Sequence, residues 1–150
     1  MIAFFIDYST QSLSGRVVYV PEDYAFQTIP SPPYWNSILL NTLELTLDIT
    51  RRITGVGGYC PHTGWANKRL DIPLPRTGGV ICDEFPSFQK RLPMSVDNRA
   101  WNVAVDREKG WVCIGDAHVQ YECVEVFSGF LMAVDNRVLR SVWICKNPYV

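Results

Sequence analysis

The sequence predicts an all-β protein of mainly antiparallel hairpins, closed as a sandwich or barrel, with at most one or two short helices. Three observations predict this fold class: a segment of strict apolar–polar alternation, a hairpin pattern that occurs three times, and Pro and Gly residues that interrupt every stretch where a long helix could run. The length of 150 residues suits a single β-rich domain spanning residues 1–150 with a full core.

The alternation lies in residues 42–50. The apolar positions are Leu43, Leu45, Leu47 and Ile49, and the polar positions between them are Glu44, Thr46, Asp48 and Thr50. A period of two places the apolar side chains on one face of a strand, whereas a helix would scatter them around its axis. We therefore expect a half-buried antiparallel strand with Ile49 in its buried face.

The hairpin pattern consists of a β-branched or aromatic segment, a short turn rich in Asp, Asn or Gly, and a second such segment. It occurs as residues 43–48 with 53–56, 101–106 with 111–114, and 129–134 with 138–144. An Asp at the end of a strand accepts hydrogen bonds from backbone N–H groups two residues on, which favours the reversal. The three hairpins predict a meandering antiparallel sheet.

The other segments carry weaker signals. Residues 2–6 and 16–20 look like two short strands of one hairpin. The several Pro residues and aromatic side chains of residues 21–36 predict an irregular loop there. Residues 70–75 should be extended, because residues before Pro avoid the helical region. Gly78 and Gly79 allow a turn into a strand at 80–82, and only a short helix fits residues 83–99.

Composition excludes several classes of function. The net charge is -1 and no basic cluster exceeds two residues, so nucleic-acid binding through phosphate contacts is not expected. No apolar run is long enough to cross a bilayer, and the apolar N-terminus lacks the flanks of a signal peptide. The five Cys are odd in number and widely spaced, which predicts reduced thiols and a cytoplasmic protein.

Two constellations could carry catalysis. Cys60 and His62 could act as nucleophile and base or as two metal ligands, but the only other His is His118 and no Cys-x-x-Cys partner exists. We favour the interpretation that Cys60 and His62 lie in a structural turn.

Paired carboxylates could perform acid–base catalysis on a glycoside, but the side chains of adjacent acids point in different directions. These pairs are Glu22–Asp23, Asp83–Glu84, and Glu122 with Glu125. We therefore predict no catalytic, cofactor-binding or metal-binding residue and no enzymatic activity.

The aromatic residues are the better candidates for a binding surface. Trp101 and Trp143 lie in predicted strands and should be buried in the core, whereas Trp35 and Trp65 lie in predicted loops and could be exposed. Exposed rings can stack on sugars or anchor a protein interface.

The second part of the chain resembles small bacterial immunity proteins that neutralise toxin domains of contact-dependent growth inhibition systems. The segments that carry the resemblance are 58–65, 70–73, 78–82, 101–106, 110–115, 124–129 and 139–148, including the last strand with its Trp and following Pro. The resemblance implies a cytoplasmic protein that binds a cognate toxin domain, often a nuclease with a basic substrate cleft. Acidic side chains would then mimic phosphate and block that cleft, while the net charge of -1 leaves room for aromatic anchoring.

Three functional hypotheses follow, in this order. The first is an immunity protein, a monomer in a 1:1 complex, that occludes the toxin active site through loops 21–36 and 59–69 and the acidic stretch at 83–84. The toxin-binding candidates are Tyr24, Trp35, Trp65, Asp83 and Glu84. The second is a carbohydrate-binding β domain that uses Trp35 and Trp65. The third is an enzyme that uses Cys60 with His62 or Asp83 with Glu84.

Overall fold

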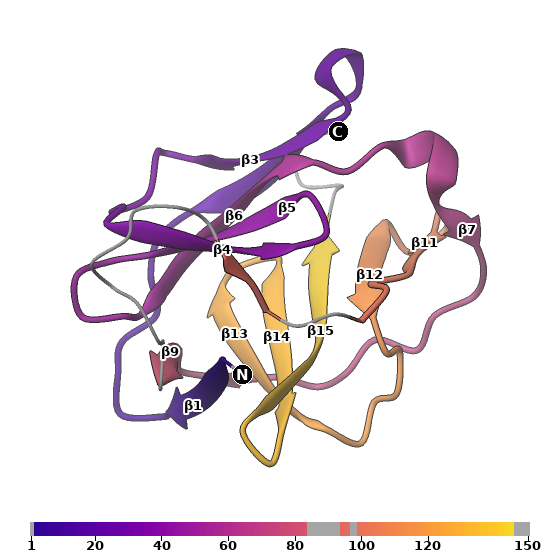
Figure 1. Cartoon of the computed structure of the whole chain (residues 1–150). Helices are drawn as coiled ribbons and strands as arrows, with labels where there is room; N and C mark the ends of the chain where they lie inside the picture. The colour runs from indigo at the N-terminus through magenta and orange to yellow at the C-terminus, as the bar shows by residue number, and fades with distance from the viewer. Residues whose placement is uncertain (1, 84–93, 97–98, 146–150) are drawn as a thin grey trace.

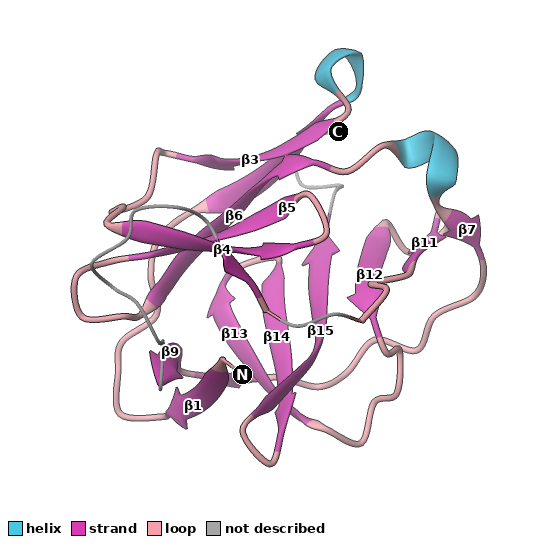
Figure 2. Cartoon of the chain, in the orientation of Figure 1, coloured by secondary structure: helices cyan, strands magenta, loops and turns pink. Residues whose placement is uncertain are grey.

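A computed structural model describes residues 2–83, 94–96 and 99–145. The all-β prediction is confirmed, because strands dominate the described residues and their helices are two short 3-10 turns, η1 (Pro21–Asp23) and η2 (His62–Gly64). Figure 2 shows this dominance of strands. The described residues contain no helix long and apolar enough to span a membrane.

The strands form two large sheets and one small one (Figure 1). The six-stranded sheet has the order β10 (Met94–Ser95), β4 (Asn36–Leu40), β5 (Leu43–Leu47), β6 (Ile53–Tyr59), β3 (Ala25–Ile29), β2 (Arg16–Val20). The seven-stranded sheet has the order β7 (Ala66–Asn67), β11 (Val103–Asp106), β12 (Trp111–Gly115), β15 (Val138–Cys145), β14 (Phe130–Asp135), β13 (Glu122–Phe127), β8 (Arg76–Thr77). The third sheet pairs β1 (Ala3–Asp7) with β9 (Gly79–Asp83).

The two large sheets share one apolar core. Leu45 from β5 and Val142 from β15 are both fully buried in the same cluster, and Phe4 from β1 joins them. In a β-sandwich, two facing sheets bury every second side chain of each strand between them and so form a common core.

The three predicted hairpins are confirmed as the antiparallel pairs β5–β6, β11–β12 and β14–β15. In the last of them Asn136 and Arg137 both have positive φ, 50° and 65°, as a two-residue turn of type I′ requires. At the β5–β6 turn, Asp48 Oδ1 accepts the N–H groups of Thr50 at 2.8 Å and Arg52 at 3.2 Å. Strand-terminal Asp therefore acts here as the sequence predicted.

The alternation prediction is right for Leu43, Leu45 and Leu47 but wrong for Ile49, which is 75% exposed. The strand ends at Leu47, because the Asp48 side chain accepts a hydrogen bond from the backbone N–H of Thr50 and so stabilises a turn that contains Ile49. The polar face is also less exposed than expected. Thr46 is buried, its hydroxyl lies 3.0 Å from that of Thr54, and the Thr54 hydroxyl donates to Pro33 O.

The predicted hairpin between residues 2–6 and 16–20 is wrong. β1 pairs with β9, which lies far along the chain, and β2 pairs with β3 instead. The predicted irregular loop at 21–36 also contains β3, whose ends are set by the 3-10 turn at Pro21 and by Pro30. Local turn residues indicate where a strand ends, but they do not determine which strand becomes its partner.

The segment 68–75, which we call the strap, crosses the outer face of the seven-stranded sheet. It leaves β7 at one edge of that sheet and reaches β8 at the other. Its Leu70 is buried and Ile72 is half-buried against one outward side chain from each long strand of the sheet. These side chains are Ala104, Cys113, Trp143, Leu131 and Cys123. The predicted core positions of Trp143 and Trp101 are confirmed at 0% and 3% exposure.

Asp106 holds the start of the strap. Its Oδ2 accepts the N–H of Leu70 at 2.9 Å and its Oδ1 accepts the N–H of Lys109 at 3.0 Å, and these two bonds lower the pKa of the carboxyl group. The Lys109 ammonium in turn donates to Leu70 O at 2.6 Å.

We expect Asp106→Asn to destabilise the protein at neutral pH, with a difference from the wild type that shrinks in acid. Because the folded-state pKa is lowered, the carboxylate stabilises the fold above its ordinary pKa of about 4 and loses that effect as pH falls through the folded value. Chemical unfolding at pH 7 and pH 3 measures both differences. An equal difference at the two pH values would contradict the role of the charge.

Candidate functional site

Six aromatic side chains gather at one end of the sandwich. Trp65 stacks on Phe26 with ring centroids 5.7 Å apart and lies 4.9 Å from Tyr19. Farther out, His62 stacks on Tyr24 at 5.4 Å, and Tyr59 meets Tyr24 edge-on at 6.3 Å. The cluster therefore runs without a break from the buried core to the surface.

Neighbouring strands position the outer rings. Ala25 on β3 pairs with Tyr59 on β6, so Tyr24 and Tyr59 arrive at the same sheet end from opposite chain directions. Tyr24 has a left-handed backbone at φ 53°, and its carbonyl accepts the N–H of Cys60 at 2.7 Å. The Tyr19 hydroxyl donates to Cys60 O at 2.8 Å and accepts the N–H of His62 at 2.9 Å, which ties η2 to β2.

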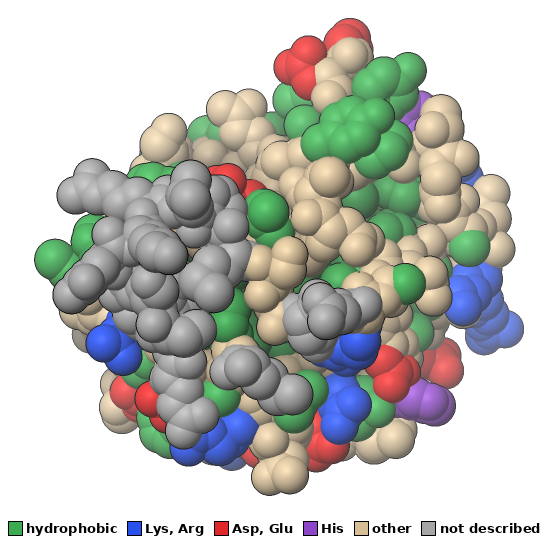
Figure 3. Space-filling model, in the orientation of Figure 1, with side chains coloured by type: hydrophobic (Ala, Val, Ile, Leu, Met, Phe, Trp, Pro, Cys, Tyr) green, Lys and Arg blue, Asp and Glu red, His purple; other side chains and the backbone are tan. Residues whose placement is uncertain are grey.

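The outer part of this cluster lies beside two acids. Tyr24 is 40% and Tyr59 is 51% exposed, and Glu22 and Asp23 are exposed on η1 directly before Tyr24. Figure 3 shows acidic side chains next to a group of hydrophobic ones at this end of the molecule. We call Glu22, Asp23, Tyr24, Tyr59 and His62 the aromatic–acidic surface.

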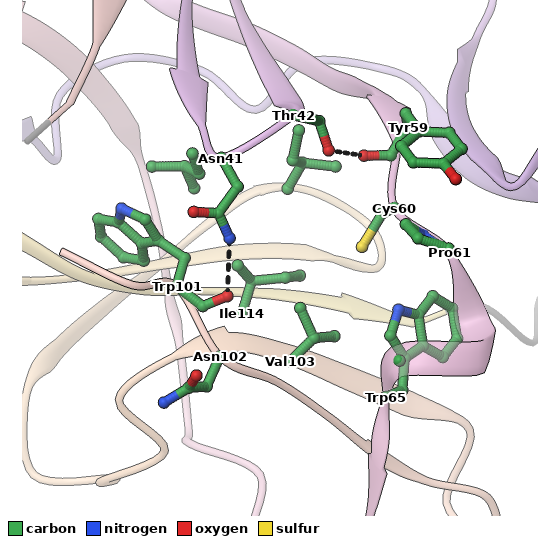
Figure 4. Close-up of a pocket in the computed structure, with 13 residues that line it drawn as sticks. Asn41, Thr42, Tyr59, Cys60, Pro61, Trp65, Trp101, Asn102, Val103 and Ile114 are labelled. Atoms are coloured by element: carbon green, nitrogen blue, oxygen red, sulfur yellow. Dashed lines mark hydrogen bonds between the residues drawn. The ribbon is translucent and has the colours of Figure 1, made fainter. Parts of the chain in front are cut away.

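A cleft of about 250 Å³ opens beside this surface, between the β4–β5 turn, the segment from Tyr59 to Trp65 and the start of β11. Figure 4 shows its walls, with the Cys60 thiol and the Trp65 indole edge turned toward each other. Two hydrogen bonds shape its rim: the Asn41 amide donates to Trp101 O at 3.0 Å and the Thr42 hydroxyl donates to Tyr59 O at 2.5 Å. A smaller pocket of about 150 Å³ lies on the other side of Trp65, beside His62 and Arg107.

The structure brings two of the predicted binding residues together and separates the others. Tyr24 and Trp65 both contact the His62 ring. Trp35 is half-buried at the other end of β5, where its backbone N–H donates to Leu47 O at 2.7 Å. Asp83 forms an ion pair with Arg137 on the β14–β15 turn, and Glu84 lies outside the described residues.

Trp65 is not the exposed ring that its loop position suggested. It is half-buried, and Phe26 covers one of its faces with an interplanar angle of 9°. A sugar ring would need such a face for stacking, so Trp65 offers the carbohydrate hypothesis little support. The cluster also contains residues that sequence reasoning missed as surface residues, Tyr59 and His62. In the sequence His62 stands out only as a neighbour of Cys60, and no local pattern marks Tyr59 as exposed.

Cys60 and His62 contact different side chains, Trp65 and Tyr19 respectively. Burial raises the pKa of the Cys60 thiol, and the Trp65 side chain offsets this only in part. His62 Nδ1 lies 3.2 Å from the Tyr19 hydroxyl. The described residues contain no group of three or more His, Cys, Asp or Glu side chains placed to hold a metal ion.

We expect Cys60 to react slowly with iodoacetamide at pH 7, because a buried thiol with a raised pKa supplies little thiolate. Peptide mass spectrometry after timed alkylation measures the rate, with guanidinium-unfolded protein as the fully reactive control. Selective and rapid labelling of Cys60 in the folded protein would contradict this expectation and restore the nucleophile hypothesis.

Comparison of the sequence with models of known protein families and with curated proteins finds no match to either.

Proposed function

We propose that this protein binds another protein through the aromatic–acidic surface and inhibits it by occlusion, as an immunity protein inhibits its cognate toxin domain. The observation that carries the proposal is that two exposed tyrosines in contact with each other lie beside two exposed acids at one end of a β-sandwich. The residues come from two segments far apart in sequence, 22–24 and 59–62, so this surface exists only in the folded chain.

The tyrosines suit a protein interface. Tyr and Trp are enriched among the residues that dominate binding energy, because a rigid ring buries a large area at a small entropic cost. Here Tyr24 is held by its contact with the His62 ring and Tyr59 by its edge contact with Tyr24. Rings that are already ordered lose less conformational freedom when a partner binds.

The two acids indicate the sign of the charge on the partner's surface. Glu22 and Asp23 sit on η1 and are exposed, and η1 has no basic residue in its last turn. A partner with a basic cleft, such as a nuclease domain, would meet complementary charge here, which speeds association and favours the correct orientation. Asp83 contributes less to such a surface, because its charge is paired with Arg137.

The proposal is tested with the protein encoded by the neighbouring reading frame, which we expect to contain a toxin domain. Induced expression of that domain should arrest growth, co-expression of this protein should restore it, and the purified pair should form a 1:1 complex. An empty vector and an unrelated β-sandwich protein serve as controls. A neighbouring reading frame without a toxin domain, together with no rescue of growth, would refute the proposal.

A further inference from the structure

The imidazole ring of His62 is held by three other rings at the outer end of the aromatic cluster. It stacks on Tyr24, and the rings of Tyr19 and Trp65 meet it edge-on at centroid distances of 5.8 Å and 6.3 Å. A ring packed among three others cannot turn freely. Each of the two imidazole nitrogens therefore keeps one direction and one set of neighbours.

The hydrogen bonds of Tyr19 determine which nitrogen of His62 carries the proton. A phenol has one proton to donate, and the Cys60 carbonyl oxygen, 2.8 Å away, can only accept it. His62 Nδ1 lies 3.2 Å from the same hydroxyl, so it contacts it favourably only as an N–H donor. The opposite arrangement would leave the buried Cys60 carbonyl without this donor, which costs more than one hydrogen bond contributes. The neutral ring is therefore protonated at Nδ1.

The second nitrogen of His62, Nε2, then carries a free lone pair. It makes no hydrogen bond to a described residue, and it is not one of the buried polar atoms that lack a partner among those residues. Nε2 is therefore in contact with solvent and can accept a hydrogen bond from a ligand. A carboxylate has only acceptors and cannot bond to it, whereas an ammonium or a guanidinium can.

The charges around His62 favour a cationic donor. Pro21 and His62 line the same small pocket of about 150 Å³, and the exposed acids Glu22 and Asp23 follow Pro21 directly. Arg107 also lines this pocket and is the like charge that opposes a cation. Two exposed acids outnumber this one exposed cation, so the local charge favours a positive ligand.

A guanidinium suits this surface better than an ammonium. The rings of Tyr24 and Tyr59 are 40% and 51% exposed, and a flat guanidinium can stack on an aromatic ring while it donates N–H groups in its own plane. An ammonium is a strongly hydrated point charge without such a face. The side chain that matches both the acceptor and the rings is therefore that of arginine.

We propose that His62 recognises an arginine of the partner: its neutral Nε2 accepts a guanidinium N–H, while Glu22 and Asp23 supply the countercharge. That a protein supplies the arginine rests on the proposed function; that the neutral ring presents an acceptor to solvent does not. His62 is thus the residue of the aromatic–acidic surface that distinguishes a donor from an acceptor.

This recognition depends on pH. An imidazole takes up its second proton between about pH 8 and pH 5, and a protonated Nε2 would become a donor and repel the arginine. The other titratable or charged groups around the ring largely keep their charge over that range. They are the phenols of Tyr19 and Tyr24, the Cys60 thiol with its raised pKa, the Arg107 guanidinium, and the carboxylates of Glu22 and Asp23.

The first test uses the free protein. Long-range ¹H–¹⁵N spectra resolve the ring nitrogens of its two histidines, and His118→Asn assigns the signals. At about pH 8, where imidazole is neutral, we expect the proton of His62 on Nδ1. Argininamide should then shift the His62 Nε2 signal in a saturable titration, while citrullinamide, its uncharged isostere, should leave that signal in place.

The second test compares two variants in the complex with the neighbouring protein. His62→Asn keeps an amide donor near the Nδ1 position and removes the outer acceptor, whereas His62→Gln keeps an uncharged acceptor near the Nε2 position. Both remove the ring that stacks on Tyr24, so their difference isolates the acceptor. His62→Asn should bind about tenfold more weakly than His62→Gln at pH 7.5, the size of a hydrogen bond to a charged group. His62→Gln should bind equally at pH 7.5 and 5.5, while the wild type loses affinity in acid.

The outcomes separate this inference from the proposed function. A proton on Nε2 in the neutral free protein, no response to argininamide, an equal response to citrullinamide, or equal affinities of the two variants would each overturn the role of His62. A complex that forms although one of these results is found would refute the role of His62 alone. A response to argininamide without any complex or growth rescue would refute the proposed function alone.

Discussion

Trp143→Ala should lower the free energy of unfolding by about 3–5 kcal/mol, the usual cost of removing a large ring from a sealed core. Trp143 is fully buried on the outer face of the seven-stranded sheet, beneath the strap, and its indole N–H donates to Ser141 Oγ at 2.9 Å. The substitution leaves a cavity that five strands and the strap cannot easily fill, and it leaves the buried Ser141 hydroxyl without this donor.

Urea unfolding followed by circular dichroism measures the loss. Leu74→Ala is the matched control, because Leu74 lies on the same strap but is 95% exposed, and its truncation should cost less than about 0.5 kcal/mol. A loss below 1 kcal/mol for Trp143→Ala would show that the strap does not seal this face of the sheet.

Tyr24→Ala and Tyr59→Ala should each weaken the complex with the toxin domain about 30-fold or more, if the aromatic–acidic surface is the interface. Truncation of a dominant interface ring costs about 2 kcal/mol or more, and each 1.4 kcal/mol is a factor of ten. Because the two rings are in contact at 6.3 Å, the double variant should lose less than the sum of the single losses. Isothermal titration calorimetry measures all three affinities.

Tyr34→Ala is the matched control for these variants. Tyr34 is 60% exposed, more than Tyr24 or Tyr59, but it precedes Trp35, whose backbone N–H donates to Leu47 O at the other end of β5. Its truncation should leave the affinity unchanged. Unchanged affinity for the Tyr24→Ala, Tyr59→Ala double variant would place the interface elsewhere on the molecule.

The chemistry of the candidate site could be predicted in part. The loop aromatics Tyr24 and Trp65 stood out in the sequence, and they do meet through His62. Trp35 was also a loop aromatic, and Asp83 and Glu84 formed an acidic stretch, yet Trp35 lies at the far end of β5 and Asp83 pairs with Arg137. Residue type indicates which side chains could bind a partner, but their distances apart depend on strand pairing across the whole chain.

The sequence by itself determined the fold class, the three local hairpins and the buried positions of Trp101 and Trp143, because period-two patterning and turn residues act over a few neighbouring residues. Only the tertiary structure decided that β1 pairs with β9, that the strap covers the outer face of a sheet, and that Tyr24, Tyr59 and His62 share one surface. These contacts join residues distant in sequence, and their selection depends on the burial of shared apolar surface rather than on any local preference of the chain.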